Sequence, residues 1–225
     1  MNQYPLKPTQ LACLVLVVFI FQSCLTPAKM DAYVGKQFNN QLPKPGKKTD
    51  TSILVTSSLY SDPNVISVTE KKSRNVLPLV LYWSYDYRHT CTLNSAIGAS
   101  YFQKAIYQQA NKLKQKLNGR HVELSIDQIP SSFAIVDKGT FVLVIIHWHK
   151  LYVEPDPKDL SVSYRILQNG AEVKSGKISV SNIERNRGIR FAQSWKSSSS
   201  EFLTQYSLDV PEMAKTVVNK LMQEL

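Results

Sequence analysis

The chain has 225 residues, of which 43% are hydrophobic and 10% aromatic, so it is long and apolar enough to fold around a substantial core. Its formal net charge of +10 is compatible with binding to anionic lipid headgroups or acidic glycans, and with solubility near a negatively charged membrane. Three cysteines exclude a dense disulfide framework, because two of them lie in or directly after an apolar leader.

The leader contains an uninterrupted apolar run at residues 11–21, which stops at Gln22, Ser23 and Cys24. These eleven residues are too few for a spanning helix, which needs about 20 residues to cross the hydrocarbon core. The short segment before the run carries Lys7 and no acidic residue, as is typical of a secretory signal.

A small residue directly before a cysteine, at Ser23 and Cys24, resembles the signal of bacterial lipoproteins. Phe21 and Gln22 depart from the usual Leu and small residue of that signal. The resemblance implies a signal peptide over residues 1–23, a cleaved chain that begins at Cys24, and lipid groups such as palmitate on that cysteine. The alternatives are a secreted protein cut near Ser23 or Ala28, and an uncleaved N-terminal anchor.

Residues 24–50 read as a flexible tether that holds the folded part away from the bilayer. Three prolines, five lysines and the absence of helical periodicity predict that residues 25–50 contain no regular element. The folded domain is then expected over residues 51–225, with strands at 53–58 and 65–69 and a stronger strand at 76–86.

A helix is expected next, because Ser100 and Gln103 have the spacing of a capping box. Gly119 predicts its end. Its apolar stripe consists of Phe102, Ala105, Ile106, Leu113 and Leu117.

The second half of the domain is expected to form an antiparallel meander and a final helix. Alternating apolar residues predict strands at 122–126, 160–167 and 172–180, and Asn169-Gly170 predicts a tight turn. Residues 141–153 read as one long strand, apolar on both faces at first, as expected beneath a helix. The last helix is expected from Pro211 to the end. The order predicts an α+β fold, a two-layer sandwich of an antiparallel sheet packed against two helices.

His147 and His149 lie two residues apart on the predicted long strand, so their side chains leave the same face. Such a pair can supply two zinc ligands, but a zinc site needs at least three protein ligands and nothing nearby provides the third. We therefore expect no metal and no cofactor, and keep the His147/His149 pair as an alternative site.

Cys91 follows His89 by two residues, but no family signature of a nucleophile and its base surrounds the pair. A lone thiol is more often a small buried hydrophobic group. With no nucleophile elbow, phosphate loop or dinucleotide fingerprint in the sequence, we do not expect an enzyme.

Residues 183–196 combine cations with aromatic rings, a composition favoured at interaction hot spots. The alternative is a solvated loop whose aromatic side chains pack back onto the core. The candidate binding residues of this segment are Arg185, Arg187, Arg190 and Trp195.

Tyrosines are also dense near the first strong strand and the helix that follows it, where five of them could form an aromatic binding face: Tyr82, Tyr85, Tyr87, Tyr101 and Tyr107. The alternative is packing at a sheet edge with the hydroxyl groups in water.

Together these features predict a lipid-anchored protein of a bacterial cell envelope, attached on the periplasmic side of the outer membrane. We expect a non-catalytic binding or accessory component of a transport or assembly complex, with the membrane and an envelope protein as partners and no nucleic acid. The architecture is similar to that of small accessory lipoproteins. The alternative is an envelope hydrolase or metal-binding enzyme that uses His147 and His149.

Overall fold

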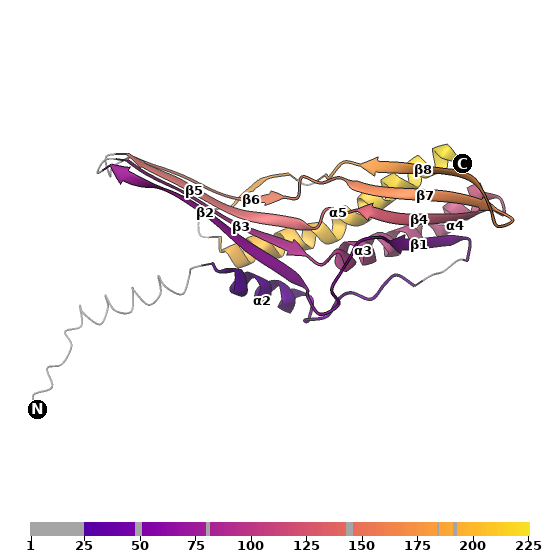
Figure 1. The fold of residues 1–225 in the computed structure, drawn as a ribbon, viewed down its shortest axis with the longest axis horizontal. Coiled ribbons are helices and arrows are strands. Elements are labelled where there is room, and N and C mark those ends of the chain that lie inside the picture. The colour runs from indigo at the N-terminus through magenta and orange to yellow at the C-terminus, as the bar shows by residue number, and fades with distance from the viewer. Residues whose placement is uncertain (1–24, 48–50, 80–81, 143–145, 184, 191–192) are drawn as a thin grey trace, which may run out of the picture.

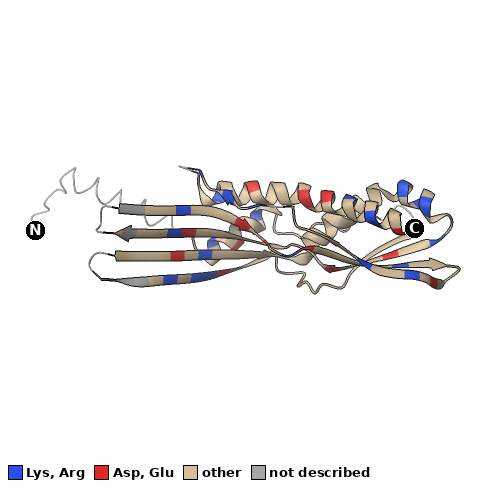
Figure 2. Cartoon of the chain, turned by 90° about the horizontal axis from the view of Figure 1, so that it is seen from above, with Lys and Arg blue, Asp and Glu red and all other residues tan. Residues whose placement is uncertain are grey.

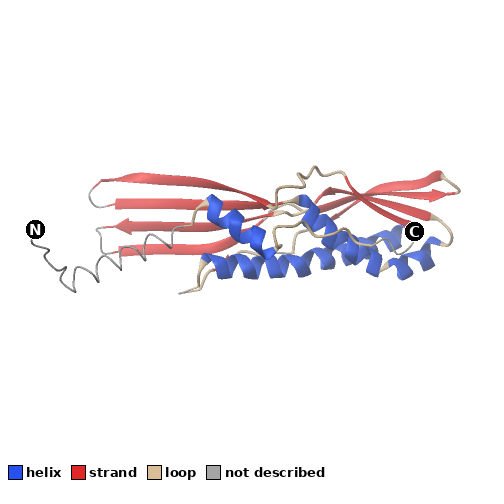
Figure 3. Ribbon diagram, turned by 90° about the horizontal axis from the view of Figure 1, so that it is seen from below, coloured by secondary structure: helices blue, strands red, loops and turns tan. Residues whose placement is uncertain are grey.

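The computed structural model describes residues 25–47, 51–79, 82–142, 146–183, 185–190 and 193–225. The proposed signal peptide and Cys24 lie outside the described residues. The protein is elongated, with two sheets arranged end to end and the helices gathered on one side of them (Figures 1 and 3).

One sheet, sheet A, has four strands and contains the last two strands of the predicted meander, at 160–167 and 172–180. The first strand of that meander, expected at 141–153, belongs to the other sheet, so the three-strand meander is wrong. Its first two strands are parallel and the other neighbours are antiparallel. Asn169 and Gly170 have positive φ angles of 50° and 82°, which confirms the tight turn between its last two strands. The strands lie in the order β1 (Ile53–Ser57), β4 (His121–Gln128), β7 (Leu160–Gln168) and β8 (Ala171–Val180).

The other sheet, sheet B, has five strands, all antiparallel to their neighbours. Its first four strands form two long hairpins whose ends project past the helices (Figure 1). The strands lie in the order β2 (Ser67–Leu79), β3 (Tyr82–Leu93), β5 (Ser132–Val142), β6 (Ile146–Pro155) and β9 (Arg187–Gly188).

These hairpins correct two sequence predictions. The single strand expected over 76–86 is the end of β2 and the start of β3, with Leu79 opposite Tyr82. The long strand expected over 141–153 is likewise the end of β5 and most of β6, with Val142 opposite Ile146. Both hairpins were missed because no Gly, Asn or Asp marks either reversal in the sequence.

The helices bury the core against the sheets. Phe102, Ile106, Leu113 and Leu117 are fully or almost fully buried, which confirms the predicted apolar stripe. The single helix expected here is divided at Gln109 into two. Asn94 caps the first instead of Ser100, and Asn118 and Gly119 end the second with φ angles of 49° and 84°. The described helices are α2 (Pro27–Gln37), α3 (Ser95–Gln108), α4 (Ala110–Leu117) and α5 (Trp195–Glu224).

Helix α2 contradicts the prediction that residues 25–50 hold no regular element. Pro27 occupies the first turn, where its missing N–H costs nothing, and the Thr26 hydroxyl accepts a hydrogen bond from the Lys29 N–H at 3.3 Å. Met30 and Val34 lie one turn apart and are completely buried. This first part of the expected tether is therefore packed on the core.

Helix α5 begins at Trp195, well before the predicted start at Pro211. The Ser194 hydroxyl caps it by accepting a hydrogen bond from the Ser197 N–H at 3.2 Å. Pro211 lies inside the helix, and buried side chains on both sides of it, such as Tyr206 and Val217, hold the two halves on the same core.

The α+β class is thus confirmed, but the single-sheet sandwich with two helices is wrong. The described residues contain two sheets. The helices all lie on one side of these sheets, where they cover sheet A and the adjoining half of sheet B (Figure 3).

Candidate binding surface

The part of sheet B that projects past the helices is here called the extension and comprises residues 72–79, 82–88, 136–142 and 146–152 (Figure 1). These segments are in register, with Lys72, Arg88, Val136 and Tyr152 side by side across the four strands. Strands that are apolar on both faces normally lie beneath helices. Here the apolar ends of the hairpins lie at the end without helix cover.

One face of the extension carries a row of aromatic rings on β3, tilted against one another. The ring centroids of Trp83 and Tyr85 are 5.5 Å apart, and those of Tyr85 and Tyr87 are 5.3 Å apart. Tyr85 lies directly over Gly139 of β5, where the Cβ of any other residue would clash with the tyrosine ring. The Lys71 ammonium group lies 5.4 Å from the centroid of the Tyr87 ring.

The opposite face carries Tyr82 and Trp148, because side chains alternate along each strand. Tyr82 is 46% exposed, Trp83 is 42% exposed and Trp148 is 58% exposed. Aromatic side chains are therefore solvent-accessible on both faces near the free end. Of the five tyrosines that the sequence analysis considered for an aromatic face, Tyr82, Tyr85 and Tyr87 lie in the extension, whereas Tyr101 and Tyr107 lie on the helix at residues 95–108.

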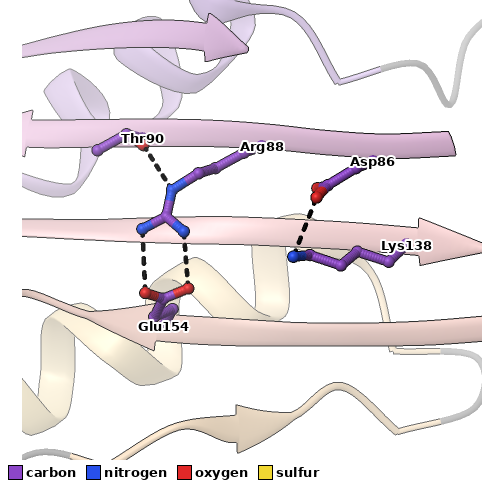
Figure 4. A network of polar contacts seen from close by, with 5 residues as sticks. All are labelled: Asp86, Arg88, Thr90, Lys138 and Glu154. Atoms are coloured by element: carbon purple, nitrogen blue, oxygen red, sulfur yellow. Dashed lines mark hydrogen bonds and ion pairs between the residues drawn. The ribbon is translucent and has the colours of Figure 1, made fainter. Parts of the chain in front are cut away.

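Ion pairs stabilise the register of the extension where it joins the body (Figure 4). Arg88 of β3 donates two hydrogen bonds to Glu154 of β6, at 2.8 and 3.1 Å, across the intervening strand. Lys138 lies 3.0 Å from Asp86, and this hydrogen bond raises the pKa of the lysine. Such exposed pairs contribute little to stability, so we assign them a role in strand alignment.

His149 lies on the face of the aromatic row and its Nε2 is 2.9 Å from the Asp137 carboxylate. Burial, followed by the charge of Asp137 and a hydrogen bond to it, raises the pKa of the neighbouring Tyr85. The side chain of His147 lies outside the described residues. Among the described residues, no group of three His, Cys, Asp or Glu side chains is placed to hold a metal ion.

A surface hollow of about 660 Å³ adjoins β6 and brings together residues that the sequence gave no reason to connect. Its lining includes His149, Leu151 and Tyr152 from β6, with Ile189 and Arg190 from the segment after β9. Arg190 is exposed, so the hollow has a cationic rim.

The four residues predicted as a basic aromatic binding loop are divided by the structure. Arg185 is exposed and donates a hydrogen bond to the Asn182 carbonyl at 3.1 Å, while Arg187 is partly buried and lies 3.9 Å from Glu201. Trp195 begins α5 and packs edge-on against Tyr33 at 5.5 Å. Trp195 therefore packs against the core, and Arg190 remains at the hollow.

Cys91 and His89 share the face of β3 that packs under α2, and both are buried. Burial raises the pKa of the Cys91 thiol to about 11, so at neutral pH it is protonated and a poor nucleophile. Burial, and then the charge of Lys71, lowers the pKa of His89, which also forms a hydrogen bond to the backbone of Leu25. The pair is a structural feature of the core that ties the start of the described chain to β3.

Two buried or half-buried carboxylates were missed by the sequence analysis. Asp31 of α2 accepts hydrogen bonds from the Ser67 hydroxyl, the Thr69 hydroxyl and the Thr69 N–H, at 2.7–3.1 Å. Asp156 accepts them from the N–H groups of Ser131 and Ser132 at 3.0 and 3.1 Å. Both carboxylates join segments distant in sequence, so no local pattern could reveal them.

Comparison with known proteins finds no matching family model, and neither a curated protein nor a solved structure is detectably similar to the chain. Among the described helices, none has the length and apolar character needed to cross a bilayer.

Proposed function

We propose that this chain is a lipid-anchored protein of a bacterial cell envelope that acts by binding, as an accessory component of a transport or assembly complex. The observation that carries the proposal is the extension, which exposes Tyr82, Trp83 and Trp148 beyond the helices. Exposed aromatic clusters of this kind are typical of interaction sites.

The backbone of the extension offers a second means of binding. Its outer strands are β2 and β6, and β9 pairs with β6 at Tyr152 and Val153, below the extension's free end. An unpaired strand edge can receive a strand from another chain through main-chain hydrogen bonds. The long edge of β2 suits a protein partner in the envelope.

The alternative function is an envelope hydrolase or metal-binding enzyme that uses His147 and His149. The contact between His149 and Asp137 aligns the histidine but does not assemble three ligands among the described residues. Zinc bound at one ion per chain in the purified protein would favour this alternative.

The proposal is tested by the fate of Cys24. Because the thiol is the attachment point for the lipid, the wild-type chain should incorporate labelled fatty acid and remain with the membrane fraction. The Cys24→Ser chain should incorporate none, and the Cys91→Ser chain, which changes a buried thiol, is the matched control and should behave as wild type. Equal labelling of wild type and Cys24→Ser would refute the lipid anchor.

Binding at the open edge is tested by a photocrosslinking amino acid placed at Lys72 of β2 or, as a control, at Val173 of β8. Both positions are exposed on outer strands of their sheets. We expect crosslinks to an envelope protein from position 72 and none from position 173. Crosslinks from neither position would mean that the extension has no protein partner.

A further inference from the structure

We propose that the free end of the extension inserts into the lipid bilayer to which the chain is anchored. This inference rests on the proposed function and names the bilayer as what Tyr82, Trp83 and Trp148 contact. Trp and Tyr are the residues enriched where proteins cross the boundary between headgroups and acyl chains, because their rings are apolar and their N–H or O–H groups stay hydrated.

The segments that contain these aromatic residues have the amino-acid composition expected of a segment in contact with lipid. Residues 76–83 and 141–148 contain no Asp, Glu, Lys or Arg. Apolar residues occupy consecutive positions in both segments. The β7–β8 hairpin, at the opposite end of the molecule, instead turns at Asn169 and Gly170 and carries charged side chains (Figures 1 and 2).

Charged side chains of the extension are set back from its free end, as Figure 2 shows. Lys72, Arg74 and Lys150 are exposed there and could meet anionic lipid headgroups. Basic residues outnumber the acidic Asp86 and Asp137 in this charged part, and the strands then become aromatic and apolar toward the free end. This is the order in which a chain entering a membrane meets headgroups, the interface and acyl chains.

The position of the anchor supports the same orientation. The hydrogen bond between His89 and the backbone of Leu25 holds the residue after Cys24 beside β3. From His89 to Tyr82 the strand continues for seven residues, or about 24 Å at the rise of an antiparallel strand. Helix α2 begins on the side of the molecule that faces the hairpin ends (Figures 1 and 3). If a lipid on Cys24 held that residue at the membrane surface, the free end of the extension would therefore project far enough beyond Cys24 to reach into the bilayer.

The open edges of β2 and β6 determine how deep the free end can go. Unpaired backbone N–H and C=O groups are too costly to leave in hydrocarbon. A single copy therefore stops at the headgroup level, and deeper insertion requires several copies to pair β2 with β6 in a closed ring, so that no edge remains open.

The inference is tested by quenching of tryptophan fluorescence with brominated phospholipids. The full-length protein is reconstituted in vesicles of phosphatidylglycerol and phosphatidylcholine, brominated either near the headgroup or at mid-chain. The wild-type protein has Trp83, Trp148 and Trp195. The double variant Trp83→Phe/Trp148→Phe keeps only Trp195, which packs against Tyr33 away from the free end. Because the two replaced indole rings are exposed, the fold of the variant should be intact.

We expect bromine to quench a large part of the wild-type emission and little of the emission of the double variant. Quenching by headgroup-proximal bromine means that single copies stop at the interface, and quenching at mid-chain means that copies pair. If the protein floats with the vesicles but both proteins are quenched equally little, the lipid anchor stands and the inference is wrong. If wild-type emission instead shifts with protein concentration in detergent and ignores bromine, the free end contacts a second copy in solution, and the inference is also wrong.

Discussion

At the scale of single residues, a few carboxylates connect parts of the chain that are far apart in sequence. Asp31 joins α2 to β2 through three hydrogen bonds, two from hydroxyl groups and one from the backbone. The Thr69 side chain it contacts is itself buried, as is that of Ser67. Removing the carboxylate would leave these donors without a partner, which costs more than the net value of a hydrogen bond.

We therefore predict that Asp31→Ala lowers the free energy of unfolding by about 1–3 kcal/mol, as measured by urea denaturation. Lys36→Ala, at an exposed position in the last turn of the same helix, should change it by less than about 0.5 kcal/mol. Equal small effects of the two substitutions would mean that Asp31 does not hold α2 on the sheet.

Residue roles were predictable where they depend on local pattern and not where they depend on distant partners. The burial of Ile106 and Leu113 was correctly predicted from the apolar stripe of the helix, and the tight turn was correctly predicted from the Asn169-Gly170 pair. The partner of His149 is Asp137, twelve residues away on the adjacent strand. That contact depends on the hairpin register, which the sequence analysis did not have.

At the scale of elements, the main errors of the sequence prediction concern where the strands of sheet B reverse direction and which end of these strands the helices cover. A continuous apolar strand usually lies beneath a helix, so residues 141–153 were interpreted as central and covered. In the structure the polar half of this region approaches the helices, and the apolar half lies at the free end (Figure 1). An apolar segment without turn residues was thus the signal that could have indicated a hairpin end beyond the helices.

The helices were easier to predict where one apolar stripe sufficed. For α2 and α5 the prolines misled the prediction, because Pro27 starts one helix and Pro211 lies within the other. Proline is tolerated in the first turn, and packing of both halves of α5 on one core outweighs the hydrogen bond lost at Pro211.

Helix α4 provides a direct test of the packing. Leu113 is completely buried, and the adjacent Lys112 is exposed. Leu113→Ala should lower the free energy of unfolding by about 2–5 kcal/mol because it leaves a cavity between the helix and the sheets. Lys112→Ala should have almost no effect on the same denaturation curve. A cost for Leu113→Ala no larger than that for Lys112→Ala would contradict the packing described here.

At the scale of the whole molecule, the two ends of the protein differ in chemistry. The described residues nearest the free end of sheet B include the exposed aromatic residues Tyr82, Trp83 and Trp148, whereas the β7–β8 hairpin at the other end carries charged residues (Figure 2). The described chain starts beside β3, so a lipid on Cys24 would lie toward the apolar end. This polarity agrees with a protein that stands on a membrane with sheet A pointing away from it.

The central claim, that the free end of sheet B faces the bilayer, is most directly tested by cysteine accessibility in isolated envelope membranes. Tyr82→Cys and Val173→Cys replace side chains that are 46% and 51% exposed, at opposite ends of the molecule. Cys91 does not interfere, because it is fully buried and its thiol pKa is about 11. We predict rapid labelling of Val173→Cys by a water-soluble, membrane-impermeant maleimide and protection of Tyr82→Cys. Equal rapid labelling of both cysteines would contradict the account.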